Sequence, residues 1–200
     1  MVRLGGAAVI VALASTAAAA PRAPGVYPVL VVHDTEKPHA YVLGCARIAK
    51  GGKAAWLAPK RCAPLLKKTM VLELVGDPTR TTVKIVRAGT GTTCPEGNAR
   101  EPYVVLSGLP EDRAHGAFVV ASGVASAEAS QEAIDAITKQ YPPGPGKRPL
   151  PPGQKPQLGV AAAFDLDGDG VAEVIVESLG EYQLFRANAE LIGTVGCEFG

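Results

Sequence analysis

One short acidic segment constrains the fold of this chain more than any other feature. Residues 165–173 read Asp-Leu-Asp-Gly-Asp-Gly-Val-Ala-Glu, so three carboxylates alternate with other residues before a fourth follows. Carboxylates crowded in this way repel one another unless a cation or a set of donors neutralises them. The residues that come next, Val174, Ile175 and Val176, favour a β-strand. The sequence therefore predicts a tight acidic loop that leads into a strand.

The oxygen donors of this loop have the spacing of a calcium site. Calcium binds about six to eight oxygen atoms, and carboxylates at positions 1, 3 and 5 of a tight turn point toward one centre. Gly170 at position 6 permits the sharp turn of the backbone. We predict Ca²⁺ as the cofactor, because an ordinary Asp/Gly hairpin turn, the alternative, carries fewer acidic residues. The predicted metal ligands are Asp165, Asp167, Asp169, the carbonyl group of Val171, and Glu173, directly or through water.

The segment from Phe164 to Glu177 resembles the calcium loops of FG-GAP and VCBS-type repeats, in which D-x-D-G-D-G-x-x-D/E joins two strands. It also resembles the dockerin loop, which helices follow. The segment departs from the EF-hand pattern at position 12, where Val176 stands in place of glutamate. The resemblance implies a structural ion between two strands. The motif occurs once here and recurs in those repeats, and the rest of the chain resembles only uncharacterised exported bacterial proteins with a single such motif.

The N-terminus has the three parts of a secretory signal peptide. Arg3 provides the positive charge, residues 4–14 are apolar, and small residues from Ser15 to Ala20 surround the expected cleavage point after Ala19. The apolar stretch is short for a membrane span, and no other segment approaches the ~20 apolar residues that a transmembrane helix needs. We therefore predict export to the periplasm or beyond, with no membrane anchor after cleavage.

The charge of the mature chain argues against nucleic acid as a partner. Of 20 basic and 19 acidic residues, cleavage removes only Arg3, so the two signs balance. Nucleic-acid binding proteins usually carry a basic excess or a basic stripe. An extracellular protein or a small molecule remains possible as a partner, and the sequence identifies neither.

Four cysteines, an even number, remain in the exported chain, which favours disulfides in an oxidising compartment. Three pairings are possible, and the sequence does not select among them. We expect Cys45–Cys62 as a local link and Cys94–Cys197 as a link between the two halves of the chain. A zinc site normally needs ligands only a few residues apart, and these cysteines are too widely spaced for that.

The predicted fold class is α+β, with mixed, mostly antiparallel strands, one clear helix and a small C-terminal β unit that carries the calcium loop. The segment 142–156 contains seven of the 17 prolines and almost no large apolar residue, which is typical of an extended linker. A surface loop within one domain is the alternative. The predicted organisation is a signal peptide at 1–19, an α+β region at 20–141, a linker at 142–156 and the β unit at 157–200.

The clear helix is predicted over 127–141, with Ser126 as its N-cap and a stripe of Ile134, Ile137 and Tyr141. A weaker helix is predicted over 56–68, where Pro59 suits a first helical position and Pro64 interrupts. Strands are predicted at 29–32, 41–45, 70–75, 81–87, 103–106, 117–121, 158–164, 171–177, 181–187 and 191–195.

No catalytic motif accompanies these elements. His33 beside Asp34, and His115, are candidate general bases, but a histidine in a surface loop is the more ordinary interpretation. The alternating spacing of the acidic loop suits a cation better than an acid/base pair. The sequence therefore favours an exported, non-enzymatic calcium-binding protein. A small secreted hydrolase without a motif-coded site and an extracellular binding or inhibitor module are the two alternatives.

Overall fold

A computed structural model describes residues 22–32, 39–75, 79–92, 100–110, 116–141, 159–178 and 181–196. Strands make up 53% of the described residues and helices 13%, so the fold is mostly antiparallel β. The predicted α+β class is wrong. Part of the segment predicted as the weaker helix forms strand β3 instead, because pairing with β2 satisfies its backbone hydrogen bonds.

The N-terminal strands form one sheet that closes on itself. Its order is β1-β7-β4-β5-β6-β2-β3, and β1 also pairs with β2, so six strands complete a ring and β3 extends it. Every pairing is antiparallel. The strands are β1 Gly25–Val32, β2 His39–Ile48, β3 Ala54–Leu57, β4 Leu72–Leu74, β5 Thr82–Thr92, β6 Arg100–Ser107 and β7 Phe118–Ala121.

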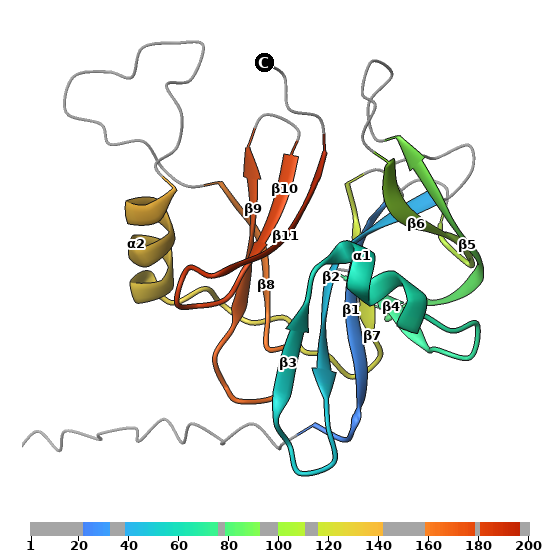
Figure 1. Cartoon of the computed structure of the whole chain (residues 1–200), viewed down its shortest axis with the longest axis horizontal. Coiled ribbons are helices and arrows are strands. Elements are labelled where there is room, and N and C mark those ends of the chain that lie inside the picture. The colour runs from blue at the N-terminus through green and yellow to red at the C-terminus, as the bar shows by residue number, and fades with distance from the viewer. Residues whose placement is uncertain are drawn as a thin grey trace, which may run out of the picture.

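The C-terminal strands form a second, four-stranded antiparallel sheet in the order β11-β10-β9-β8. Its strands are β8 Val160–Phe164, β9 Glu173–Ser178, β10 Glu181–Phe185 and β11 Leu191–Gly196. Helix α2, Gln131–Gln140, lies on one side of this sheet and the first sheet lies on the other (Figure 1). The sheet is therefore the middle layer of the molecule, which explains why β9 is buried through its first four residues.

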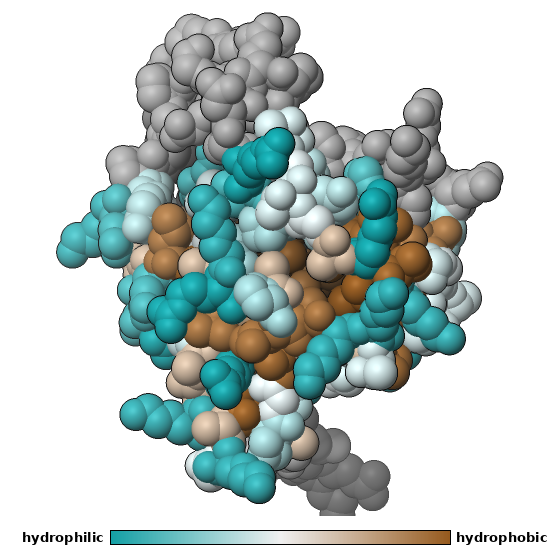
Figure 2. Space-filling model, turned by 45° about the vertical axis from the view of Figure 1, so that its right-hand side comes forward, coloured by the Kyte–Doolittle hydropathy of each residue, from teal (hydrophilic) through white to brown (hydrophobic). Residues whose placement is uncertain are grey.

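Two apolar interfaces hold these layers together. On one side, Leu43 of β2 belongs to the same buried cluster as Phe164, Leu184 and Ile192 of the second sheet. On the other side, Ile137 of α2 packs in a cluster that contains strand residues of the second sheet. On the face drawn in Figure 2, apolar residues gather across the middle and hydrophilic residues lie around them. The C-terminal unit thus docks on the N-terminal one through a shared core.

Both predicted helices differ from the observed ones. Helix α2 begins at Gln131, after Ser130, whose side chain accepts a hydrogen bond from the Ala133 amide. The predicted cap, Ser126, instead forms an isolated antiparallel β-bridge with Phe164, the last residue of β8. Of the predicted stripe, Ile137 is fully buried, while the ring of Tyr141 packs against that of Phe185 at a tilted angle.

The weaker predicted helix is mostly absent. Trp56 lies in β3, where it pairs with Ala46 of β2, so the strand pairing overrides the helical composition. Only one helical turn, α1 Pro59–Cys62, and a 3-10 turn, η1 Ala63–Leu65, follow it. Pro59 begins α1 as the sequence predicts. Pro64 lies in η1, where it interrupts the α-helical hydrogen bonding.

The predicted strands are found with shifted ends. The predicted strands at 70–75 and 81–87 correspond to β4 and β5, which pair antiparallel. The predicted strands on each side of residues 165–172 and 186–190 are also found, and the two strands of each pair are antiparallel neighbours. The sequence does not reveal that β7 leaves its chain neighbour β6 and inserts between β1 and β4.

The disulfide Cys45–Cys62 is confirmed and links β2 to the end of α1. The two Cα atoms lie 5.8 Å apart, within the usual range for a disulfide, and both residues are fully buried. The bond closes the connection that carries β3, so it restricts the unfolded chain as well as joining neighbouring elements.

Replacing both residues in a Cys45→Ala/Cys62→Ala variant should lower the free energy of unfolding by about 3 kcal/mol. The loss reflects a loop of 17 residues that is no longer closed in the unfolded chain. Urea unfolding of the variant and of the wild type measures it. A non-reducing tryptic digest is the control, because cleavage at Arg47 and Lys60 leaves the two cysteines joined only through sulfur. An unchanged unfolding free energy would contradict the prediction.

Several predictions concern residues outside the described ranges. They include the signal peptide, the linker at 142–156, Cys94 and Cys197, and the histidines His33 and His115 with Asp34. None of the described helices is long and apolar enough to cross a membrane.

Candidate metal site

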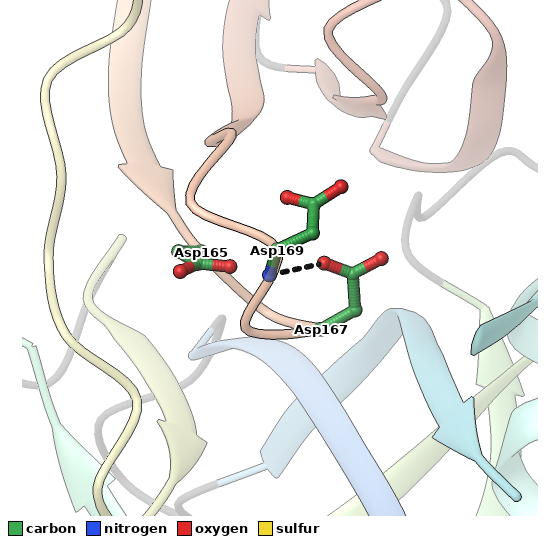
Figure 3. A group of neighbouring side chains, drawn as sticks. All are labelled: Asp165, Asp167 and Asp169. Atoms are coloured by element: carbon green, nitrogen blue, oxygen red, sulfur yellow. Dashed lines mark hydrogen bonds between the residues drawn. The ribbon is translucent and has the colours of Figure 1, made fainter. Parts of the chain in front are cut away.

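The acidic loop connects β8 to β9 at the point where these two strands separate. Phe164, the last residue of β8, pairs with Glu173, the first residue of β9. The loop between them brings together the carboxylates of Asp165, Asp167 and Asp169, whose nearest oxygen atoms all lie within 4.8 Å of one another. Figure 3 shows the three side chains around the turn. Three carboxylates this close form a group that could hold a metal ion.

Backbone amides of the loop fix the orientation of the carboxylates. The two oxygens of Asp165 accept hydrogen bonds from Gly168 N (2.7 Å) and Gly170 N (3.2 Å). Asp167 Oδ1 accepts one from Asp169 N at 3.2 Å, drawn as the dashed line in Figure 3. The backbone thereby curls around Asp165, and the turn needs positive φ at Gly168 (79°) and Gly170 (85°).

Asp169 completes this pattern at the end of the loop. Its Oδ1 accepts a hydrogen bond from Val171 N at 2.7 Å. The second oxygens of Asp167 and Asp169 have no hydrogen-bond donor among the described residues, so they remain available to a cation. The side chain of Val171 has no atom that binds a metal ion, so only the backbone carbonyl group of this residue could contribute.

Glu173 lies beneath the loop and is only 3% exposed. Its Oε2 accepts a hydrogen bond from Leu166 N at 2.9 Å, which links the first residue of β9 to the start of the loop. The structure does not place Glu173 in the group formed by the three aspartates. The negative charges of Asp167 and Asp169 nevertheless raise the pKa of its carboxyl group. The predicted role of Glu173 as a ligand, directly or through water, therefore stays a prediction.

The site disfavours negative charge in the absence of a cation. Burial raises the pKa of Glu173 to about 8, and the charges of Asp167 and Asp169 contribute further. Burial also raises the pKa of Asp167, and repulsion from the negative charge of Asp169 raises it further. A bound cation would reverse both effects because it stabilises the ionised carboxylates.

Arg22 is the residue that sequence reasoning missed at this site. Its guanidinium group donates hydrogen bonds to the carbonyl oxygen of Asp165 (2.6 and 3.2 Å) and to that of Gly123 (2.9 Å). The guanidinium carbon also lies 5.5 Å from the centre of the Tyr27 ring. Arg22 therefore holds the first residue of the loop against the N-terminal sheet. Its place just after the expected cleavage point offers no sequence signal for a contact so distant along the chain.

Comparison with protein families, with curated proteins and with solved structures finds no match to this chain. The function is therefore inferred from the residues and geometry of the site alone.

Proposed function

We propose that this protein is exported and binds one calcium ion in the loop between β8 and β9, where the ion stabilises the fold. The observation that carries the proposal is the convergence of Asp165, Asp167 and Asp169 on one small region, with their carboxylates already oriented by backbone amides. Calcium suits this arrangement because it accepts many oxygen ligands in flexible geometry, whereas Mg²⁺ demands a near-ideal octahedron. The Val171 carbonyl, Glu173 and water would supply further oxygens.

The position of the loop supports a structural role. It joins two adjacent strands of the middle layer, and Leu166 within it is fully buried in the core shared by both sheets. An ion at this point would couple the packing of Leu166 to the neutralisation of the carboxylates around it. The buried Cys45–Cys62 bond is consistent with an oxidising compartment outside the cytoplasm. Calcium at extracellular concentrations would then hold the loop closed.

Calcium should raise the thermal unfolding midpoint of the wild-type protein and leave that of Asp167→Ala unchanged. Extracellular modules typically bind calcium at roughly 10⁻⁴–10⁻³ M, so 10 mM calcium stabilises the folded state by about 1.4–2.7 kcal/mol. Differential scanning calorimetry in EDTA, in calcium and in magnesium measures the shift. Asp135→Ala, which removes an exposed carboxylate from α2, is the matched control and should respond as the wild type does. An equal calcium response in Asp167→Ala would rule out this site.

A further inference from the structure

We propose that the tip of hairpin β2–β3 carries a second binding site, for a small organic anion with a compact alkyl or aryl body. Figure 1 shows this hairpin at the lower end of the molecule. A cavity of about 530 Å³ is lined by residues of the hairpin and by Pro24. Its volume lies within the range of small-molecule pockets. Three basic residues, Arg47, Lys50 and Lys53, line it, and no acidic residue does.

The turn of the β2–β3 hairpin places Lys50 and Lys53 at the same cavity. Ala49 N donates to the carbonyl oxygen of Lys53 (3.1 Å), and Gly52 N donates to that of Ala49 (3.1 Å), so Lys50 and Lys53 flank a closed turn. Gly51 and Gly52, with φ of 108° and 80°, permit that turn. Glycine residues at these positions therefore bring basic residues together that the sequence separates.

The three cations are available to a ligand. All three side chains are exposed, and in the part of the chain that the structure describes none forms an ion pair with a carboxylate. Like charges gathered at one site repel one another, and an anion placed among them relieves that repulsion. The site therefore favours an anionic ligand.

The rest of the cavity wall is apolar. The remaining lining residues are Pro24, Ile48, Ala49, Ala54 and Ala55. Ala55 pairs with Arg47 across the two strands, and Ala54 pairs with Ile48, so both strands of the hairpin contribute to the wall. An inorganic anion would leave this apolar wall in contact with water, whereas an anion with an alkyl or aryl body would cover it. The chemistry points to an amphiphilic carboxylate, sulfate or phosphate ester.

Monomeric octyl phosphate, used below its micelle concentration, is the probe. Calorimetric titration of the oxidised mature protein should show binding, and amide chemical shifts should change within residues 47–55. Inorganic phosphate and octanol should each bind more weakly, because each supplies only one of the two interactions. Shift changes elsewhere, or equal binding of inorganic phosphate, would overturn the proposal.

A triple variant, Arg47→Gln/Lys50→Gln/Lys53→Gln, should weaken binding about tenfold or more, since each exposed ion pair contributes up to about fivefold. The matched control, Lys67→Gln/Lys68→Gln/Lys84→Gln, changes the net charge equally at exposed residues outside the cavity and should bind as the wild type does. Equal weakening in both would mean that net charge alone attracts the anion, and it would overturn the proposal.

A second variant tests the wall without removing a cation. Ala55→Glu places a carboxylate beside Arg47 and should abolish binding of octyl phosphate, whereas retained affinity would contradict the site. Binding to phosphatidylglycerol vesicles but not to monomeric octyl phosphate would assign the cations to a membrane surface and likewise overturn the proposal. The titrations are run in EDTA and in calcium and should agree, so their failure leaves the proposed calcium site untouched.

Discussion

Gly193→Ala should lower the free energy of unfolding by about 3 kcal/mol, because it forces the two sheets apart. Gly193 lies in β11 and is buried against β2. A Cβ atom at this position would overlap the carbonyl oxygen of Leu43 and lie 2.7 Å from Cδ of Pro59. Neither obstacle can move aside easily, since one is the backbone of the buried strand β2 and the other is a proline ring.

Urea unfolding measures this loss, and Gly25→Ala provides its control. A Cβ at Gly25 would meet no atom closer than 3.5 Å, which is an ordinary contact, so that variant should be nearly as stable as the wild type. Both substitutions remove the same backbone freedom from the unfolded chain, and their difference isolates the steric effect. A Gly193→Ala protein with wild-type stability would mean that β11 and β2 do not pack as closely as the structure shows.

In EDTA, the stability of the protein should fall as the pH rises from about 4.5 to about 8, by a total on the order of 5 kcal/mol. The cause is Glu173, whose pKa is raised by burial from 4.5 to about 8 in the folded protein. Between these two values the unfolded chain has released the proton while the folded chain keeps it. The unfolded state then binds fewer protons, so its formation becomes more favourable with each rise in pH.

Glu173→Gln separates this effect from other titrations. Its amide oxygen can still accept the hydrogen bond from Leu166 N, but it has no proton to release, so the pH profile in EDTA should become nearly flat. Saturating calcium should flatten the wild-type profile as well, because the cation favours the ionised carboxylates. Chemical denaturation at a series of pH values provides the measurement. A wild-type profile in EDTA that rises toward pH 8 would show that Glu173 is ionised in the folded protein.

The acidic loop was predictable because its information is local. Asp165, Asp167 and Asp169 lie within five residues, and the glycines that permit the turn stand between them, so nearest neighbours in sequence become nearest neighbours in space. The strands on each side were predictable for the same reason, since β-branched residues favour extended backbone. The pairing of Cys45 with Cys62 was expected from their closeness in sequence and is confirmed.

The fold class was not predictable in this way, because it depends on contacts between distant segments. Ser126 has a side chain suited to an N-cap, yet it forms a β-bridge with Phe164. The helix begins only at Gln131, with Ser130 as its N-cap. Trp56 lies in a segment of helical composition, yet pairing with β2 makes it part of a strand. Local propensities differ by less than the free energy of burying a strand edge, so tertiary packing decides such cases.

By itself, the sequence determined the acidic loop and the strands that flank it, since each depends on residues close together in the chain. Only the tertiary structure decided that β7 inserts between β1 and β4 and that Arg22 holds the carbonyl of Asp165. These contacts join residues whose separation along the chain carries no pattern. Their free energy comes from burial and charge placement in the finished fold, which no local window of sequence contains.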